Sequence, residues 1–305
     1  MMLFEIPRHD EVVAAALAED LGVPAERLLG GLADSALLDK DVTSTIAVDA
    51  GVRFEGVITA REPGVVCGLG VVESVYSMLS RAAALPEPVE VFPLVAEGTR
   101  VQPGTRVAEV SGPARAVMTG ERTALDFLMV LSGIATEAAR WQDEAGDALA
   151  VLDTRKTLPG LRMLSKYAVR VGGASNHRLG LFDMVLIKDN HITTAGSIGA
   201  AVASARALTP DLAVEVEADT IAQAVEAAWA GADIVLLDNM DDETLAAAVL
   251  AVRDAATRAG ARVLTEASGG VRFDRLAALR AAGVDRVSTS TLTLARPLDF
   301  GLDGL

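Results

Sequence analysis

Residues Asp233 to Gly270 read DIVLLDNMDDETLAAAVLAVRDAATRAGARVLTEASGG, two short apolar runs on either side of an Ala-rich segment with helical spacing. Short runs of Ile, Leu and Val favour buried strands, and the longer segment favours an amphipathic helix. A strand, a crossover helix and a second strand form one unit whose strands lie parallel. This stretch therefore predicts a parallel α/β sheet.

The same alternation extends from Leu149 to Ser288, and each apolar run ends on a polar residue. The runs are LAVLD ending at Asp153, DMVLIK at Lys188, AVEVE at Glu217, DIVLLD at Asp238, RVLTE at Glu266 and DRVS at Ser288. In open sheets and in barrels alike, functional groups gather beyond the carboxyl ends of parallel strands. Six polar strand ends favour a closed barrel over an open doubly wound sheet.

The first third of the chain is mixed and predicts an α+β domain. Apolar residues recur at helical spacing in 10–21 and 71–85. Residues 54–60 alternate as in a strand, and residues 89–110 contain short strands separated by turns. Residues 114–144 predict a helix with a break near Ser132 and Gly133. We expect an N-terminal α+β domain over 1–117 and an α/β barrel over 118–295, with the tail 296–305 packing back on the first domain.

Composition excludes several classes of protein. The chain has 305 residues, is 51% apolar and carries a formal net charge of -15, which argues for a large core and against adhesion to nucleic acid or anionic membranes. The window from Val151 to Asn190 is different, because its 7 Lys and Arg against 3 Asp give +4. A locally basic pocket for a small anion is compatible with this distribution.

Cysteine usage and the N-terminus indicate the compartment. A single cysteine, Cys67, excludes an intrachain disulfide and a Cys-based zinc cluster. The opening MMLFEIPRHDEVV has no apolar core of a signal peptide, and no run of about 18 apolar residues follows. We expect a cytoplasmic protein without a membrane span.

Two segments bring cations together beyond strand ends. Arg155 and Lys156 follow the first run; such a pair can bind a phosphate or a carboxylate, although a solvated turn is the commoner role of one pair alone. In VGGASNHRLGLFDMVLIKDNHI, residues 171–192, a Gly-Gly loop precedes His177 and Arg178, and Lys188 ends the next run. That combination favours a functional site over packing.

Carboxylates and a glycine loop complete the candidate site. Glu217 and Asp238 end neighbouring runs, so they either share a Mg²⁺ ion or pair with nearby Arg or Lys, and both interpretations remain open. Glu215 points to the same face as Glu217 and would support it from behind. Ser268, Gly269 and Gly270 precede a helix expected near Phe273, where backbone N–H groups can bind phosphate, although such turns are common.

Taken together, these segments resemble the quinolinate phosphoribosyltransferase family. The matching blocks are GERTALDFLMVLSGIAT from Gly120, DTRKTLPGLRMLSKYAVRVGG from Asp153, NHRLGLFDMVLIKDNHI from Asn176, EVEAD from Glu215, LLDNM from Leu236 and EASGG from Glu266. The resemblance implies a seven-stranded α/β barrel with an N-terminal α+β domain. It also implies phosphoribosyl transfer from phosphoribosyl pyrophosphate to quinolinate with decarboxylation, in a homodimer or higher homo-oligomer with shared active sites.

The resemblance assigns roles residue by residue. Quinolinate would contact Arg155, His177, Arg178 and, from the neighbouring subunit, Arg122. The catalytic residues would be Lys156 and Lys188, which face phosphoribosyl pyrophosphate, with Glu217 and Asp238, which organise Mg²⁺ and the ribose hydroxyls. The 5′-phosphate would bind Ser268, Gly269 and Gly270, with Ser290 nearby.

The chain departs from the family where the last strand ends. The family usually has S-V-G-A-L-T-H-S, whereas residues 288–295 read STSTLTLA, so Ser290 replaces a glycine and Leu294 a histidine. Ser290 would add a hydroxyl donor or crowd the phosphate, and a lost donor costs about 1–3 kcal/mol. Smaller departures are Ala174 for a loop glycine and Asp126 for an asparagine.

Three alternatives follow from the residues. A paralogue could use another pyridine carboxylate or phosphorylated sugar, which the departures at Ser290 and Leu294 motivate. A catalytically silent protein could bind a phosphorylated ligand, although keeping all the cations and both carboxylates argues against it. An aldolase could form a Schiff base on Lys188.

Overall fold

The computed structural model describes residues 5–30 and 33–305. The N-terminal stretch that argues against a signal peptide therefore lies partly outside the described residues, because its first four residues are not included. Contacts divide the chain into two compact units. The first holds residues up to Glu137 together with 158–172 and 294–305, and the second holds 138–157 and 173–293. Each unit is built from segments that are far apart in the sequence.

The first unit combines helices with an antiparallel sheet, which confirms the predicted α+β class. Its helices are α1 (Asp10–Leu21), α2 (Glu26–Leu29), η1 (Leu37–Lys40), α3 (Val42–Ala47), α4 (Leu69–Ala82), α6 (Arg162–Val171) and most of α5 (Ala114–Ala145). The sheet order is β12 (Phe300–Gly304), β1 (Arg53–Ala60), β5 (Arg106–Pro113), β3 (Glu90–Pro93), and β2 (Gly64–Val65) pairs with β4 (Arg100–Val101). Strand β12 pairs with β1 so that Leu302 lies opposite Ile58.

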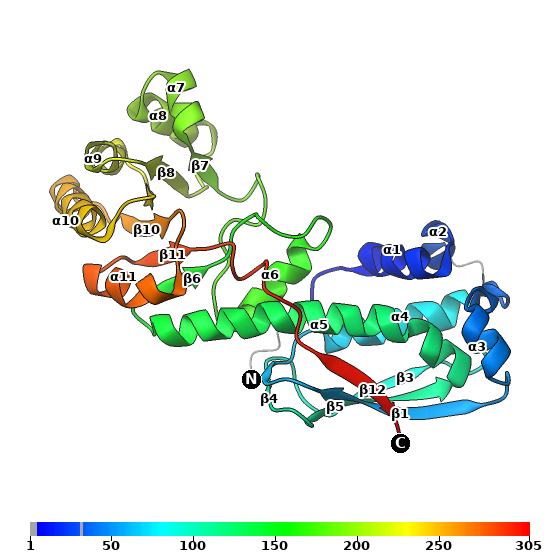
Figure 1. Ribbon diagram of the computed structural model, residues 1–305. Coiled ribbons are helices and arrows are strands. Elements are labelled where there is room, and N and C mark those ends of the chain that lie inside the picture. The colour runs from blue at the N-terminus through cyan, green and yellow to red at the C-terminus, as the bar shows by residue number, and fades with distance from the viewer. Residues whose placement is uncertain (1–4, 31–32) are drawn as a thin grey trace. The chain divides into compact units, whose positions relative to one another are not determined.

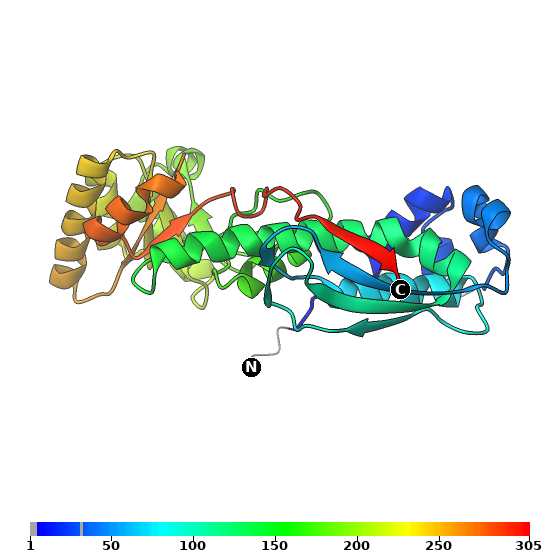
Figure 2. The same ribbon diagram turned by 60° about the horizontal axis from the view of Figure 1, so that its bottom comes forward.

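The predicted break near Ser132 is wrong, because α5 is continuous from Ala114 to Ala145 (Figure 2). The Ser132 hydroxyl accepts a hydrogen bond from Cys67 N over 2.9 Å and donates one to Cys67 O over 3.1 Å. A Cβ on Gly133 would lie 2.1 Å from the carbonyl oxygen of Arg296. The Ser-Gly pair therefore admits neighbouring backbone to the helix surface and does not interrupt the helix.

The second unit contains all six predicted strands, and they form one parallel sheet with helices outside it (Figure 1). The order is β6 (Ala150–Leu152), β11 (Arg286–Ser288), β10 (Leu264–Ser268), β9 (Ile234–Asp238), β8 (Val214–Ala218), β7 (Val185–Ile187). The helices are α7 (Asp189–Ala195), α8 (Ile198–Leu208), α9 (Ile221–Ala230), α10 (Asp242–Ala259), η2 (Phe273–Arg275) and α11 (Leu276–Ala282). This confirms the parallel α/β architecture.

A seventh strand is reduced to one residue. Ser175 forms a single parallel bridge with Leu152 of β6, beside the edge of the six-stranded sheet. The chain turns just before it at Gly173, whose φ of +91° suits glycine. Just after it, Asn176 and the backbone of His177 bond to the Asp153 carboxylate. Strand pairing therefore stops at Ser175, and the residues that follow it bond to Asp153 at the carboxyl end of β6.

The core of the second unit explains why the strands read as continuous apolar runs. Residues 234–237 of β9 are all buried, as expected for a parallel strand covered on both faces. Within the part of the chain that is described, no helix combines the length and the apolar character needed to cross a bilayer.

Candidate active site

A cavity of about 480 Å³ lies at the carboxyl ends of the strands in the second unit. It brings together every residue predicted for the site except Arg122 and Ser290. The lining residues are Thr154, Arg155, Lys156, His177, Arg178, Leu186, Lys188, Glu217, Leu236, Asp238, Asn239, Ser268, Gly269, Gly270 and Ser288. These residues come from the ends of all six strands of the sheet and from the segment after Ser175, as in other parallel α/β proteins.

A larger groove of about 1000 Å³ lies in the first unit, beside α4 and the antiparallel sheet. Its charged lining residues are Glu55, Glu73, Arg81, Glu90 and Glu109. Because negative charge dominates there, the groove is a poor site for an anion. The cationic cavity of the second unit is therefore the candidate active site.

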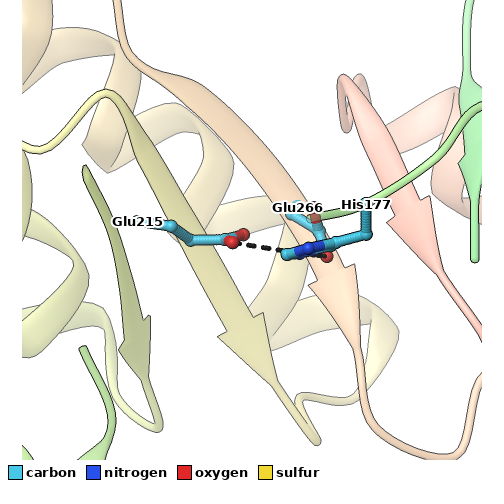
Figure 3. Close-up of side chains that lie close together, drawn as sticks. All are labelled: His177, Glu215 and Glu266. Atoms are coloured by element: carbon cyan, nitrogen blue, oxygen red, sulfur yellow. Dashed lines mark ion pairs between the residues drawn. The ribbon is translucent and has the colours of Figure 1, made fainter. Parts of the chain in front are cut away.

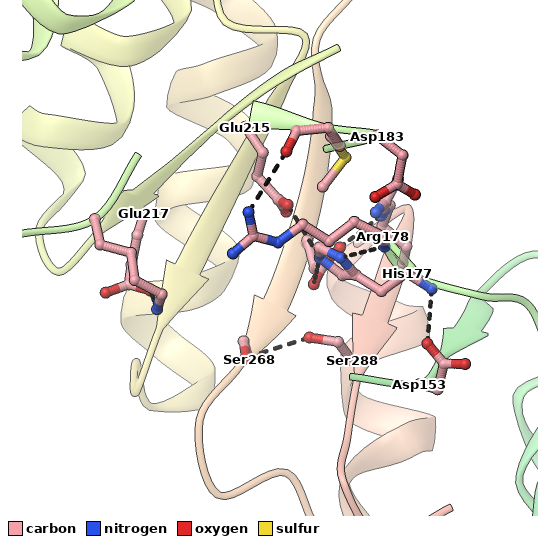
Figure 4. A network of polar contacts seen from close by, with 12 residues as sticks. Asp153, His177, Arg178, Asp183, Glu215, Glu217, Ser268 and Ser288 are labelled. Carbon is pink, nitrogen blue, oxygen red and sulfur yellow. Dashed lines mark hydrogen bonds and ion pairs between the residues drawn. The ribbon is translucent and has the colours of Figure 1, made fainter. Parts of the chain in front are cut away.

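Asp153 at the end of β6 holds the segment that carries His177. The buried carboxylate accepts a hydrogen bond from His177 N over 2.9 Å and another from Asn176 Nδ2 over 2.6 Å (Figure 4). Beyond it, Arg155 and Lys156 line the cavity, so the TRK segment is more than a solvated turn. The Arg155 Nε atom is buried and has no hydrogen-bond partner among the described residues, which leaves it available to a ligand.

Arg178 adds a second guanidinium to the same wall. Its Nη1 lies 3.5 Å from the carbonyl oxygen of Met184. Partial burial and the positive charge of Arg155 lower the pKa of Arg178 from its usual value. An anion bound beside two cations reduces their mutual repulsion, and a dianion would neutralise both charges.

Behind the cavity, His177 has two fully buried carboxylates, Glu215 and Glu266, beside one of its ring nitrogens (Figure 3). Its Nε2 is 3.0 Å from Glu215 Oε2 and 3.4 Å from Glu266 Oε1. Its Nδ1 accepts the backbone N–H of Arg178 over 2.8 Å. Both ring nitrogens of His177 are therefore occupied by protein groups, and the ring itself forms part of the cavity wall.

The electrostatics of this buried layer have opposing causes. Burial alone would lower the pKa of His177, but the carboxylates of Glu215 and Glu266 outweigh it and raise that pKa to about 9. Burial, together with the charge of Glu266, raises the pKa of Glu215. Burial acts on Glu266 in the same direction, but His177 and Arg286 hold its pKa at about 2.

The same three groups have the spacing of a metal site, because their ligand atoms lie within 4.8 Å of one another. The Arg178 contact decides against that use. A ring whose Nδ1 accepts an N–H carries its proton on Nε2, so Nε2 has no lone pair for a metal ion. Arg286, whose Nε is 2.6 Å from Glu266 Oε2, already supplies a cation. We therefore interpret the cluster as a hydrogen-bonded layer.

Lys188, Glu217 and Asp238 lie on the other wall. Lys188 Nζ forms an ion pair with Glu217 Oε2. For this carboxylate, pairing with a nearby Arg or Lys was one of the two interpretations that the sequence left open. The Asp238 Oδ2 atom accepts a hydrogen bond from Asn239 Nδ2 over 2.6 Å. These contacts use one oxygen of each carboxylate, and both carboxylates line the cavity on neighbouring strands.

The Ser-Gly-Gly loop is held close to Asn239. Gly269 has a φ of +82°, and a Cβ there would lie 2.3 Å from Asn239 Oδ1. Asn239 itself has a φ of +52°, a left-handed conformation that is uncommon outside glycine. The helix expected after this loop begins as the short 3-10 turn η2, and α11 starts only at Leu276.

Two predicted residues lie outside the cavity. Arg122 is on α5 in the first unit, 61% exposed, with Nη1 3.3 Å from Asp126 Oδ1. Ser290 does not line the cavity. Among the described non-glycine residues, positive φ occurs at Ala84 and Asn239, so the backbone of Ser290 is not left-handed. Serine therefore replaces the family's glycine here without backbone strain. Leu294 is 56% exposed in the first unit.

Several residues of the site were not predicted as binding residues. Thr154, Asn239 and Ser288 line the cavity, and Leu186 and Leu236 give it an apolar wall. Ser288 ends a predicted strand, and Asn239 follows one directly, so strand-end position was the signal that could have found them. Glu266 was identified only as a strand end, although it is buried in contact with His177.

Comparisons with known proteins agree along most of the chain. The family models described as quinolinate phosphoribosyl transferase, N-terminal domain and C-terminal domain, match residues 41–132 and 134–303. The chain is 40% identical to the nicotinate-nucleotide pyrophosphorylase (carboxylating) of Mycobacterium leprae over 86% of this chain and 90% of that one. It is 40% identical to the protein of the same name from Homo sapiens over 81% of each chain. The crystal structure of nicotinate-nucleotide pyrophosphorylase from Ehrlichia chaffeensis superposes with a TM-score of 0.83 at 30% identity, covering 100% of both chains.

Proposed function

This chain belongs to the quinolinate phosphoribosyl transferase family, and we propose that the cavity of its second unit is the site at which quinolinate and phosphoribosyl pyrophosphate react. The products are nicotinate mononucleotide, CO₂ and pyrophosphate, which makes the protein a pentosyltransferase of NAD biosynthesis. The observation that carries the assignment of the site is the meeting of Arg155, Lys156, Arg178 and Lys188 in one cavity with a Ser-Gly-Gly loop.

The charges of the cavity match those of the substrates. Phosphoribosyl pyrophosphate carries about five negative charges and quinolinate about two, which four side-chain cations and a divalent ion largely balance. We assign the quinolinate carboxylates to Arg155 and Arg178, because both line the cavity, the charge of Arg155 acts on Arg178, and the Nε of Arg155 lacks a partner among the described residues. Lys156 and Lys188 are assigned to the phosphates and Ser268, Gly269 and Gly270 to the 5′-phosphate.

Binding and orientation supply most of the catalysis in this reaction. As pyrophosphate leaves C1 of the ribose, that carbon gains positive character and the pyridine nitrogen bonds to it. The ring nitrogen is then cationic and stabilises the electron pair that remains on C2 when the C2 carboxylate leaves as CO₂. A proton at C2 completes the product. The chain's own task is to hold the two substrates in line and to keep the departing pyrophosphate paired with lysine.

We propose that Glu217 and Asp238 hold Mg²⁺ together with substrate phosphates. The donor set fits, because both side chains offer hard oxygen ligands and each has one oxygen outside its contact with Lys188 or Asn239. When bound, the ion would neutralise part of the pyrophosphate charge. Calorimetric titration of the wild-type protein with Mg²⁺ and phosphoribosyl pyrophosphate, compared with Asp238→Asn, tests this assignment without relying on turnover.

We further propose a cytoplasmic homodimer in which Arg122 completes the partner's cavity. Support comes from Arg122 lying exposed on α5 and not being among the residues that line the cavity of the second unit. Arg122→Ala and Lys188→Ala proteins should each be inactive alone. Mixing them should restore part of the activity by forming one complete site, and no restoration despite demonstrated subunit exchange would contradict the shared site.

The test of the function itself is direct. Purified protein incubated with quinolinate, phosphoribosyl pyrophosphate and Mg²⁺ should form nicotinate mononucleotide, CO₂ and pyrophosphate in equal amounts, measured by mass spectrometry and a pyrophosphate assay. Nicotinate in place of quinolinate is the matched control, because it lacks the C2 carboxylate. Turnover of nicotinate with no turnover of quinolinate would overturn the proposal and favour a paralogue.

A further inference from the structure

We propose that Glu266 is a positioning residue shared by the two halves of the cavity: it supports Arg178 through His177 on the pyridine side, and Ser268 through Ser288 on the phosphate side. The inference rests on the proposed function, since it takes the two halves to bind the two substrates. Glu266 itself is fully buried and does not line the cavity.

The pyridine branch runs through His177. One carboxylate oxygen of Glu266 lies 3.4 Å from His177 Nε2, and Glu215 approaches the same atom to 3.0 Å. The other ring nitrogen accepts the Arg178 backbone N–H over 2.8 Å. The orientation of the ring is thus set from behind by carboxylates, and the ring in turn fixes the backbone from which the Arg178 side chain extends.

The phosphate branch runs along the strand next to β10. Arg286 is the register partner of Glu266, and its Nε is 2.6 Å from Glu266 Oε2. Ser288 lies two residues further along β11 and therefore on the same face as Arg286, so the Arg286–Glu266 ion pair holds β11 against β10 next to the point from which Ser288 extends. The Ser288 hydroxyl also lies 3.3 Å from that of Ser268, the first residue of the glycine loop (Figure 4).

Glu215 provides an internal comparison. Apart from His177, no described residue gives its carboxylate oxygens a hydrogen bond. It therefore belongs to the pyridine branch alone, whereas Glu266 belongs to both branches. Losing Glu215 should affect one half of the cavity, losing Ser288 the other, and losing Glu266 both.

The experiment uses the full-length variants Glu266→Gln, Glu215→Gln and Ser288→Ala, with Glu243→Gln on the exposed surface of α10 as the control. KM for each substrate and kcat are measured, and quinolinate and ribose 5-phosphate are titrated separately by calorimetry. We expect Glu215→Gln to weaken quinolinate and Ser288→Ala to weaken ribose 5-phosphate, each roughly tenfold and selectively. Glu266→Gln should weaken both, with kcat changed less than either KM, and Glu243→Gln should change neither.

A folded Glu266→Gln protein that weakens one ligand or neither would overturn the proposal, as would Glu215→Gln and Ser288→Ala variants with identical ligand profiles. If Glu266→Gln does not fold, Glu266→Asp, which keeps the charge and withdraws it by one methylene, replaces it under the same criteria. The calorimetric titrations measure ligand binding and do not depend on turnover. A wild-type protein that binds both ligands without forming product would contradict the proposed function and leave this test intact.

Discussion

The backbone N–H of Arg178 donates to Nδ1 of His177 over 2.8 Å, at the opposite side of the ring from Glu215 and Glu266. The carboxylates favour a second proton on the ring, but that proton would sit on Nδ1 and face another donor. We therefore expect the neutral ring, which forms above the pKa of about 9, to carry its single proton on Nε2. Nitrogen-15 NMR of histidine-labelled protein at about pH 10, assigned with His177→Gln, checks this, and a neutral ring with its proton on Nδ1 would contradict it.

The pKa of Glu266 predicts a specific response to acid. Because His177 and Arg286 hold this pKa at about 2, below the ordinary 4.5, the carboxylate stabilises the folded state above pH 4.5 and loses that contribution as the pH falls toward 2. Glu266→Gln should lower the free energy of unfolding at pH 7 by about 3 kcal/mol, since it leaves Arg286 without its partner. The difference from wild type should shrink between pH 4.5 and 2. Urea unfolding across this range measures it, and a constant difference would refute the assignment.

Gly269 and Gly270 should differ in their tolerance of a side chain. Both have positive φ, but a Cβ on Gly269 would lie 2.3 Å from Asn239 Oδ1, whereas nothing lies within 4 Å of one on Gly270. Gly270→Ala should cost about 1–2 kcal/mol from backbone strain alone. Gly269→Ala should lower the thermal midpoint further and raise the KM for phosphoribosyl pyrophosphate more. Equal effects of the two substitutions would show that Asn239 moves aside freely.

The close approach at Gly133 predicts a stability defect that arises in the first unit. Gly133→Ala would place a Cβ 2.1 Å from Arg296 O, so the helix or the 296–297 backbone must shift, at a cost of about 1–3 kcal/mol. Gly51→Ala is the matched control, because a Cβ there meets nothing within 4 Å. Thermal unfolding of the two variants checks the expectation. A Gly133→Ala protein as stable as Gly51→Ala would argue that this contact is loose.

The strands and most cavity residues could be predicted because their signals are local. A parallel strand buried on both faces is an uninterrupted apolar run, and its first polar residue marks where the run leaves the core. Lys188 and Asp238 occupy that position, Glu217 is the last residue of its run, and all three line the cavity. Their grouping follows from the parallel arrangement alone, without any knowledge of side-chain contacts.

What the sequence could not reveal depends on contacts between distant segments. Glu215 lies inside an apolar run and Glu266 at the end of one, and neither position indicates that both face His177. Likewise, a Ser-Gly pair inside a helical pattern is a local sign of a break. At Ser132 and Gly133 it instead marks the place where two other backbone segments touch α5. Local propensity was outweighed there by tertiary packing.

The pairing of β12 with β1 has a consequence for biosynthesis. The two strands lie far apart in the sequence, since 242 residues separate Arg61, which follows β1, from Asp303 in β12. A ribosome adds about 5–20 residues per second, so roughly 12–50 seconds pass between the emergence of β1 and that of its partner. During that interval the nascent chain presents an unpaired strand edge, which other chains can capture. Slow translation of the segment between β1 and β12 would therefore prolong the period in which a chaperone has to shield the β1 edge.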